Sequence, residues 1–263
     1  RGLGDVYKRQ VKNHSMERCP SGLRCKPGTF VWGQLHRGFE SPPLRFFLFI
    51  TINNADERVI MKKVLCFGDS NTYGYCPGRA IRYDKNSRWS GILKQLCDGK
   101  FEIIEAGCNN RTAFSDNPAG IEQTGYKVLP NLLQQNPDYI ILAIGLNDLQ
   151  YSYAPTLQQV EDGIKLLIRI IKETCPCAKI VLAAPSVITT DILHSYFINL
   201  FDMDSIEKSK HLPAIYKTIA QSEDCIFIDL NKIAKVSEAD GLHYKAEEHQ
   251  KIAQAMFELL NNN

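Results

Sequence analysis

The stretch YIILAI at residues 139–144 decides the fold class, because it is apolar at every position. An uninterrupted apolar strand is covered on both faces and is typical of the centre of a parallel sheet, whereas a half-solvated strand alternates. Four more short apolar runs lie before and after it, at residues 62–67 (KKVLCF), 101–105 (FEIIE), 179–184 (KIVLAA) and 225–228 (CIFI). The sequence therefore predicts five strands.

Segments with the helical spacing of apolar residues separate these strands. Helices are predicted over residues 89–96, 121–135, 156–174, 205–221 and 246–260. We expect Pro130 to bend the second of them and Pro213 to break the fourth. The alternation of strands and helices predicts an α/β fold, a three-layer α/β/α sandwich around a five-stranded parallel sheet. In such sheets ligands bind beyond the carboxyl ends of the strands.

Residues 1–60 differ from the rest of the chain. They carry ten Lys and Arg against five Asp and Glu and show no helical or strand periodicity. DVYKRQ at residues 5–10 resembles a translated transposon-end adapter, and GFES at residues 38–41 resembles a translated arm of a transfer-RNA gene. We expect residues 1–60 to be conceptual read-through before a true start at Met61, with one domain over residues 61–263. A native, disordered leader is the alternative.

Composition argues against several classes of partner and ligand. Residues 61–263 carry 21 Lys and Arg against 24 Asp and Glu, so no basic face for nucleic acid is indicated. No apolar run approaches the roughly 20 residues of a membrane-spanning helix. The nine cysteines suggest free thiols in a reducing, cytoplasmic compartment. Neither a metal nor a cofactor is predicted, because the His and Cys residues lack ligand spacing.

Chemically useful residues follow several of the predicted strands. Ser70 opens a helix or turn after the first strand, where its hydroxyl is exposed and its N–H is free. Gly107 can present a backbone N–H, and Asn147 can present a side-chain amide. Asp240 precedes His243 by three residues and can fold back onto the imidazole. Taken singly, each is equally well explained as a turn, a cap or a solvated side chain.

Together these blocks resemble the SGNH (GDSL-type) hydrolase superfamily over residues 62–260. The stretches at 66–74, 88–91, 107–112 and 240–243 look most like its arylesterase/acyltransferase branch. The matching blocks are Gly68-Asp69-Ser70, Gly107, Gly145-Leu146-Asn147-Asp148 and Asp240-Gly241-Leu242-His243. The resemblance implies a flavodoxin-like hydrolase fold. The chain departs from the pattern at Asn71, where the family name expects Leu, and at residues 108–110.

The resemblance implies a Ser-His-Asp mechanism. Ser70 would attack an ester carbonyl, His243 would take and return the proton, and Asp240 would hold the imidazole. The N–H groups of Ser70 and Gly107 and the side chain of Asn147 would form the oxyanion hole. Asp69 is expected to cap local N–H groups and not to act in the triad, and Asp148 to orient its own loop.

The implied activity is a serine esterase that acts on short-chain aryl or acetyl esters through an acyl-enzyme, with transfer to alcohols as a further capacity. Alternatives are a carbohydrate O-acetyl esterase, a lysophospholipase-type lipase, or a non-enzymatic flavodoxin-like module that binds phosphate or flavin. Substrate-binding candidates are Tyr73, Tyr75, Trp89 and Cys108, with core aromatics as the alternative reading. The apolar segment 186–212 is expected to cover the site, to form a subunit contact in a homo-oligomer, or to build a local core.

Overall fold

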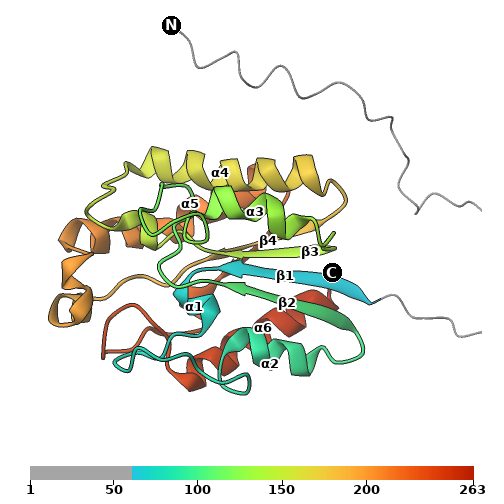
Figure 1. Cartoon of the computed structure of the whole chain (residues 1–263), viewed down its shortest axis with the longest axis horizontal. Coiled ribbons are helices and arrows are strands. Elements are labelled where there is room, and N and C mark those ends of the chain that lie inside the picture. Colours follow the sequence, from blue (N-terminus) through green and yellow to red (C-terminus); the bar gives the residue numbers. More distant parts are fainter. Residues whose placement is uncertain (1–60) are drawn as a thin grey trace, which may run out of the picture. The chain divides into compact units, whose positions relative to one another are not determined.

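The structure, a computed structural model, describes residues 61–263, and the predictions made for residues 1–60 lie outside this range. Its five strands are all parallel and lie in the order β2-β1-β3-β4-β5 (Figure 1). They are β1 (Lys62–Gly68), β2 (Phe101–Gly107), β3 (Tyr139–Ala143), β4 (Lys179–Ala184) and β5 (Ile226–Asp229). Every residue of the central strand β3 is buried. The predicted fold class is confirmed.

Helices cover both faces of the sheet (Figure 1). One apolar core packs α2 (Trp89–Leu96) and α6 (Ala246–Asn261) against the sheet. The opposite core holds α3 (Gly125–Leu133), α4 (Leu157–Thr174) and α5 (Met203–Ser222). Burial of two apolar layers is the main favourable contribution to folding, and it fixes the sheet that carries the site.

Two predicted helices differ in detail from those observed. The helix α5 is not broken at Pro213 and runs continuously from Met203 to Ser222. A proline removes one intrahelical hydrogen bond, and the burial of Leu212 and Tyr216 on either side of it keeps the helix packed. The helix α3 begins at Gly125, four residues later than predicted, and includes Pro130.

The register of the strands brings their carboxyl ends to one edge. Gly68 at the end of β1 pairs with Gly107 of β2 and with Ala143 of β3. The segments that follow these strands therefore begin side by side. They include the one-turn helix α1 (Ser70–Tyr73) and the 3₁₀ turn η2 (Asn147–Leu149).

Candidate active site

A serine, a histidine and an aspartate form a continuous hydrogen-bonded chain at this edge. Ser70 Oγ lies 2.8 Å from His243 Nε2, and His243 Nδ1 lies 2.9 Å from Asp240 Oδ2. The three residues are buried, with at most 7% of any one exposed. When Nδ1 carries the proton, Nε2 can accept the proton of the Ser70 hydroxyl. The arrangement is that of an activated nucleophile.

The carboxylate of Asp240 is fixed on its other oxygen as well. Its Oδ1 accepts hydrogen bonds from the backbone N–H groups of Leu242 at 3.1 Å and His243 at 2.9 Å. The loop that carries the imidazole is thus folded around the carboxylate that orients it. The three-residue spacing seen in the sequence is what allows this turn.

The nucleophile sits on the first residue of α1. Asp69 caps this helix, because its Oδ1 accepts a hydrogen bond of 2.9 Å from the N–H of Asn71. Burial raises the pKa of Asp69 to about 7. Asp69 therefore has the expected structural role, and the N–H of Ser70, as the first residue of a helix, has no intrahelical partner.

The departure from the family pattern at Asn71 connects the two halves of the site. Its Nδ2 donates a hydrogen bond of 3.1 Å to the backbone carbonyl of Leu242, the residue before His243. Asn71 is only 8% exposed. A leucine could not make this bond, so in this chain a polar contact holds the nucleophile turn against the loop of the base.

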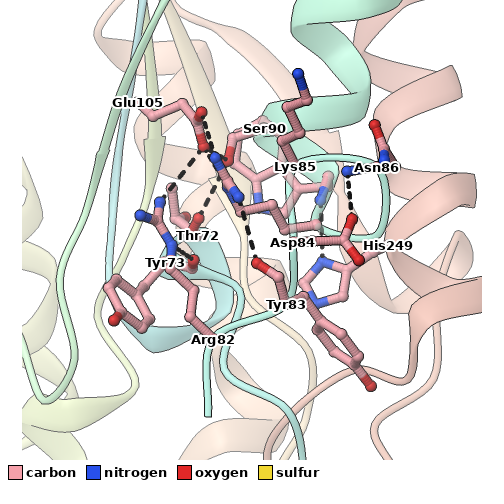
Figure 2. Close-up of polar contacts among 12 residues, drawn as sticks. Thr72, Tyr73, Arg82, Tyr83, Asp84, Lys85, Asn86, Ser90, Glu105 and His249 are labelled. Carbon is pink, nitrogen blue, oxygen red and sulfur yellow. Dashed lines mark hydrogen bonds and ion pairs between the residues drawn. The ribbon is translucent and has the colours of Figure 1, made fainter.

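A polar cluster around Glu105 lies at the far end of α1. Figure 2 labels three of its members, Arg82, Ser90 and Glu105. With Arg88, which bonds to the same carboxylate, these residues are called the Glu105 cluster. Arg88 donates to both carboxylate oxygens of Glu105, at 2.6 and 2.7 Å, and Ser90 donates to the same carboxylate at 2.8 Å. Ser90 also lies 3.3 Å from the carbonyl of Thr72, and Arg82 Nε lies 2.8 Å from that of Tyr73. The carbonyl of Tyr73, the last residue of the nucleophile helix, thereby receives a side-chain donor.

The ionisation of Glu105 depends on these neighbours. Burial alone would raise its pKa, but the hydrogen bonds from Arg88 and Ser90 outweigh burial and keep the pKa below its ordinary value. The hydrogen bond with Glu105 in turn raises the pKa of Arg88. The pair is therefore charged on both sides at neutral pH. Because Arg88 lies at the N-terminus of α2 and Glu105 lies on β2, the pair joins this end of α2 to the edge strand of the sheet.

Gly107 packs directly on the backbone of α1. A Cβ added to it would lie 2.1 Å from the backbone nitrogen of Tyr73 and 2.4 Å from the carbonyl carbon of Thr72. No side chain fits there, so the residue type is dictated by this contact. The end of β2 can approach the nucleophile closely only because position 107 is glycine.

Asn147 is linked to both neighbouring loops through Arg111. The Asn147 Nδ2 atom donates to the carbonyl of Arg111 at 3.0 Å, and the Arg111 guanidinium donates to the carbonyl of Gly68 at 3.1 Å. Arg111 is 3% exposed, and burial lowers its pKa. The side chain of Asp148 accepts N–H bonds from residues 113–115, with Ala113 at 2.6 Å. The loops after β1, β2 and β3 form one connected structure.

Two aromatic rings lie against the catalytic imidazole. The centroid of Tyr75 is 4.3 Å from that of His243, and the centroid of Phe197 is 5.2 Å from it. Phe197 comes from the 3₁₀ turn η4 (Tyr196–Asn199). Part of segment 186–212 therefore covers the histidine, while its residues Ile192 and Phe201 are buried in the main core.

The remaining predicted substrate residues differ in position. Tyr73 lies beneath Arg82, whose guanidinium carbon is 4.5 Å from the ring centroid. Cys108 is half-buried beside Gly107 and lies 3.7 Å from the amide nitrogen of Gln123. The prediction that Trp89 binds substrate is corrected. Trp89 is 2% exposed and packs in the core between α2, α6 and the sheet, so it does not line the site.

Several residues of the site were not identified from the sequence. They are Arg111, the Glu105 cluster and Gln150, whose Nε2 donates to Asn147 Oδ1 at 3.2 Å. Phe197, in contrast, belongs to the segment 186–212 that was expected to cover the site. The missed residues make contacts between segments far apart in the chain, and the sequence has no local signal for such contacts.

Within residues 61–263, no group of three or more His, Cys, Asp or Glu side chains is arranged to hold a metal ion. In the same part of the chain, no helix combines the length and the apolar character needed to cross a bilayer.

Comparisons with known proteins agree with this geometry. The profile of the GDSL-like lipase/acylhydrolase family matches residues 66–251. The native aryl esterase of M. smegmatis is 26% identical, with a TM-score of 0.71, 76% of this chain covered and 99% of that one. Est24, a carbohydrate acetylesterase from Sinorhizobium meliloti, is 27% identical, with the same TM-score and coverage. A Bacillus subtilis protein, described as the uncharacterized lipoprotein YqeF, is 29% identical over 102 residues, which span only 38% of its length.

Proposed function

The chain belongs to the GDSL-like lipase/acylhydrolase family, and on this premise we propose that it is a serine esterase that hydrolyses short-chain carboxylic esters through an acyl-enzyme. The observation that carries the proposal is the chain of hydrogen bonds from Ser70 through His243 to Asp240. A serine hydroxyl is a weak nucleophile, and a base in hydrogen-bonding reach makes it competent.

The reaction proceeds in two halves. Ser70 Oγ forms a bond to the ester carbonyl carbon while its proton passes to His243 Nε2. The tetrahedral intermediate then expels the alkoxide, which takes the proton from His243 and leaves the acyl group on Ser70. A water molecule, deprotonated by His243, then attacks the acyl carbon. The second tetrahedral intermediate breaks its bond to Ser70 Oγ, which takes the proton back from His243, and the carboxylic acid is released. Asp240 stabilises the imidazolium in both halves.

The negative oxygen of the intermediate needs donors in place before the reaction begins. We assign this role to the N–H groups of Ser70 and Gly107 and to Asn147 Nδ2. One hydrogen of Asn147 Nδ2 is used by the carbonyl of Arg111, which leaves the other for the oxyanion. Removal of one such donor typically slows an enzyme by about 10²–10³-fold.

The preference for aryl or acetyl esters is part of the proposal. Two of the similar structures are an aryl esterase and a carbohydrate acetylesterase. In addition, the alcohol that leaves must accept a proton from His243, and the rings of Tyr75 and Phe197 flank that imidazole. A planar leaving group would find an aromatic surface there.

The proposal has two further parts, acyl transfer and a cytoplasmic location. Acyl transfer to an alcohol follows the same route as hydrolysis, with the alcohol in place of the water that attacks the acyl-enzyme. A cytoplasmic location agrees with the seven cysteines of the described range, which are all free thiols.

The proposal is tested with p-nitrophenyl esters of increasing acyl length and with an acetylated sugar. We expect turnover to be greatest with the acetate and to be lost in Ser70→Ala, while Ser152→Ala, at an exposed position, behaves as wild type. Turnover that is greatest with long acyl chains would instead favour the lipase alternative. Hydrolysis that persists in Ser70→Ala would contradict the esterase mechanism itself.

A further inference from the structure

The amide of Asn147 must be held in one of two orientations. Its oxygen and nitrogen differ little in shape, but only the nitrogen can donate a hydrogen bond to an oxyanion. A rotation by half a turn about the last side-chain bond would present the oxygen instead. The residues that contact both ends of this amide therefore decide whether it can stabilise the intermediate.

Gln150 contacts the oxygen end. Its Nε2 donates to Asn147 Oδ1 at 3.2 Å and to Asn110 Oδ1 at 2.8 Å. Gln150 and Asn147 are 3% and 5% exposed, so water competes little for these atoms. With its oxygen engaged by Gln150, Asn147 keeps its Nδ2 directed at the carbonyl of Arg111.

Asn110 holds Gln150 in turn. It adopts a left-handed backbone conformation, with φ of 58°, which asparagine tolerates better than most residues. Its backbone carbonyl accepts a hydrogen bond of 2.7 Å from Asn117 Nδ2. The backbone of Asn110 is thus held in the loop after β2, while Gln150 and Asn147 belong to the segment after β3.

These contacts close a ring between the two loops that carry oxyanion donors. The ring runs from Asn147 through Gln150 to Asn110 and returns through the neighbouring residue Arg111 to Asn147. We propose that Gln150, anchored by Asn110, is a positioning residue that orients the Asn147 amide for the oxyanion. The inference rests on the proposed function, because it needs a reaction that develops negative charge at an acyl oxygen.

Gln150→Glu is the sharpest test of this role. The substitution keeps the shape and replaces a donor by a carboxylate that only accepts. Asn147 Oδ1 would then face a carboxylate, and the amide would turn its Nδ2 toward residue 150. We expect kcat for p-nitrophenyl acetate to fall about 10²-fold, as for loss of one oxyanion donor, with KM changed less than about threefold. The matched control is Gln158→Glu, an exposed glutamine on α4, which is expected to keep the wild-type rate.

A double-mutant cycle with Asn147→Ala separates orientation from general damage. If Gln150 acts through Asn147, adding Gln150→Glu to Asn147→Ala lowers kcat by less than about threefold. If the fall in kcat of the double variant equals the product of the two single falls, the inference is overturned. The inference is also overturned if kcat of Gln150→Glu stays within threefold of wild type while Asn147→Ala is slow.

Gln150→Leu keeps the test valid if a carboxylate is not tolerated at this buried position. It removes the donor without adding charge, and we expect a smaller fall in kcat that is likewise absent in the Asn147→Ala background. Labelling of Ser70 by a fluorophosphonate counts the folded sites in every variant. If Asn147→Ala keeps the wild-type rate, the positioning role is refuted while the esterase stands, whereas activity that survives in Ser70→Ala refutes the proposed function itself.

Discussion

Gly107→Ala is expected to disable the enzyme while leaving most of its fold in place. The added methyl carbon would lie 2.1–2.6 Å from three backbone atoms of Thr72 and Tyr73, where ordinary contact is 3.4–4 Å. These atoms belong to α1, the helix that carries Ser70. Because backbone atoms cannot swing aside as the end of a side chain can, the helix or the end of β2 must move.

The size of the effect follows from that displacement. Relief of the overlap requires a shift of about 1 Å, and a misplacement of about 1 Å can cost about 10²-fold in rate. Two of the assigned oxyanion donors, the N–H groups of Ser70 and Gly107, lie on the segments that separate. We therefore expect kcat to fall about 10²–10⁴-fold. Overpacking typically costs about 1–3 kcal/mol of unfolding free energy.

The assay is p-nitrophenyl acetate turnover, scaled to the Ser70 sites labelled by a fluorophosphonate, with urea unfolding in parallel. Gly99→Ala is the matched control, because its added Cβ meets nothing within 4 Å but its φ is +73°. An alanine in that conformation costs about 1–2 kcal/mol, so this variant should lose similar stability and keep kcat. A folded Gly107→Ala protein with kcat within about threefold of wild type would refute the steric argument.

Two further predictions concern charge. Glu105→Gln leaves the guanidinium of Arg88 without its carboxylate and should lower the unfolding free energy by about 2–3 kcal/mol. The loss is smaller than for a fully buried pair, because the Glu105 side chain is 19% exposed. Urea unfolding of this variant that matches wild type would contradict the prediction. Burial lowers the pKa of His249 to about 3, from an ordinary 6.5, so its stabilising effect is complete above about pH 6.5 and is lost as the pH falls. Relative to His249→Gln, wild type should lose about 2 kcal/mol between pH 7 and pH 5 by urea unfolding, and parallel profiles would exclude the effect. The buried Asp69, with its pKa raised to about 7, acts in the opposite direction but is present in both proteins.

The strands could be predicted to within two residues, because burial on both faces leaves a signal in the local sequence. The strand predicted at 179–184 matches β4, and the one predicted at 225–228 is shifted by one residue in β5. Helix continuity was harder to predict. Pro213 is unfavourable locally, and the packing of α5 that outweighs it is a tertiary effect.

The residues of the site likewise fall into those that the sequence could predict and those that it could not. Ser70, Asp240 and His243 could be proposed from short blocks and a family resemblance, and the structure brings them into hydrogen-bonding distance. The surrounding residues could not be proposed in this way. Gln150 meets Asn110 across 40 positions of the chain, so nothing near either residue marks the pair.

The contact between Ser70 and His243 also determines when the chain can first become active. The serine and the histidine are 173 positions apart in the chain. During synthesis, the ribosome therefore releases a nucleophile long before it makes the base. A nascent or refolding chain has no ester turnover until the loop at residues 240–243 docks beside α1, so the onset of catalysis reports this docking.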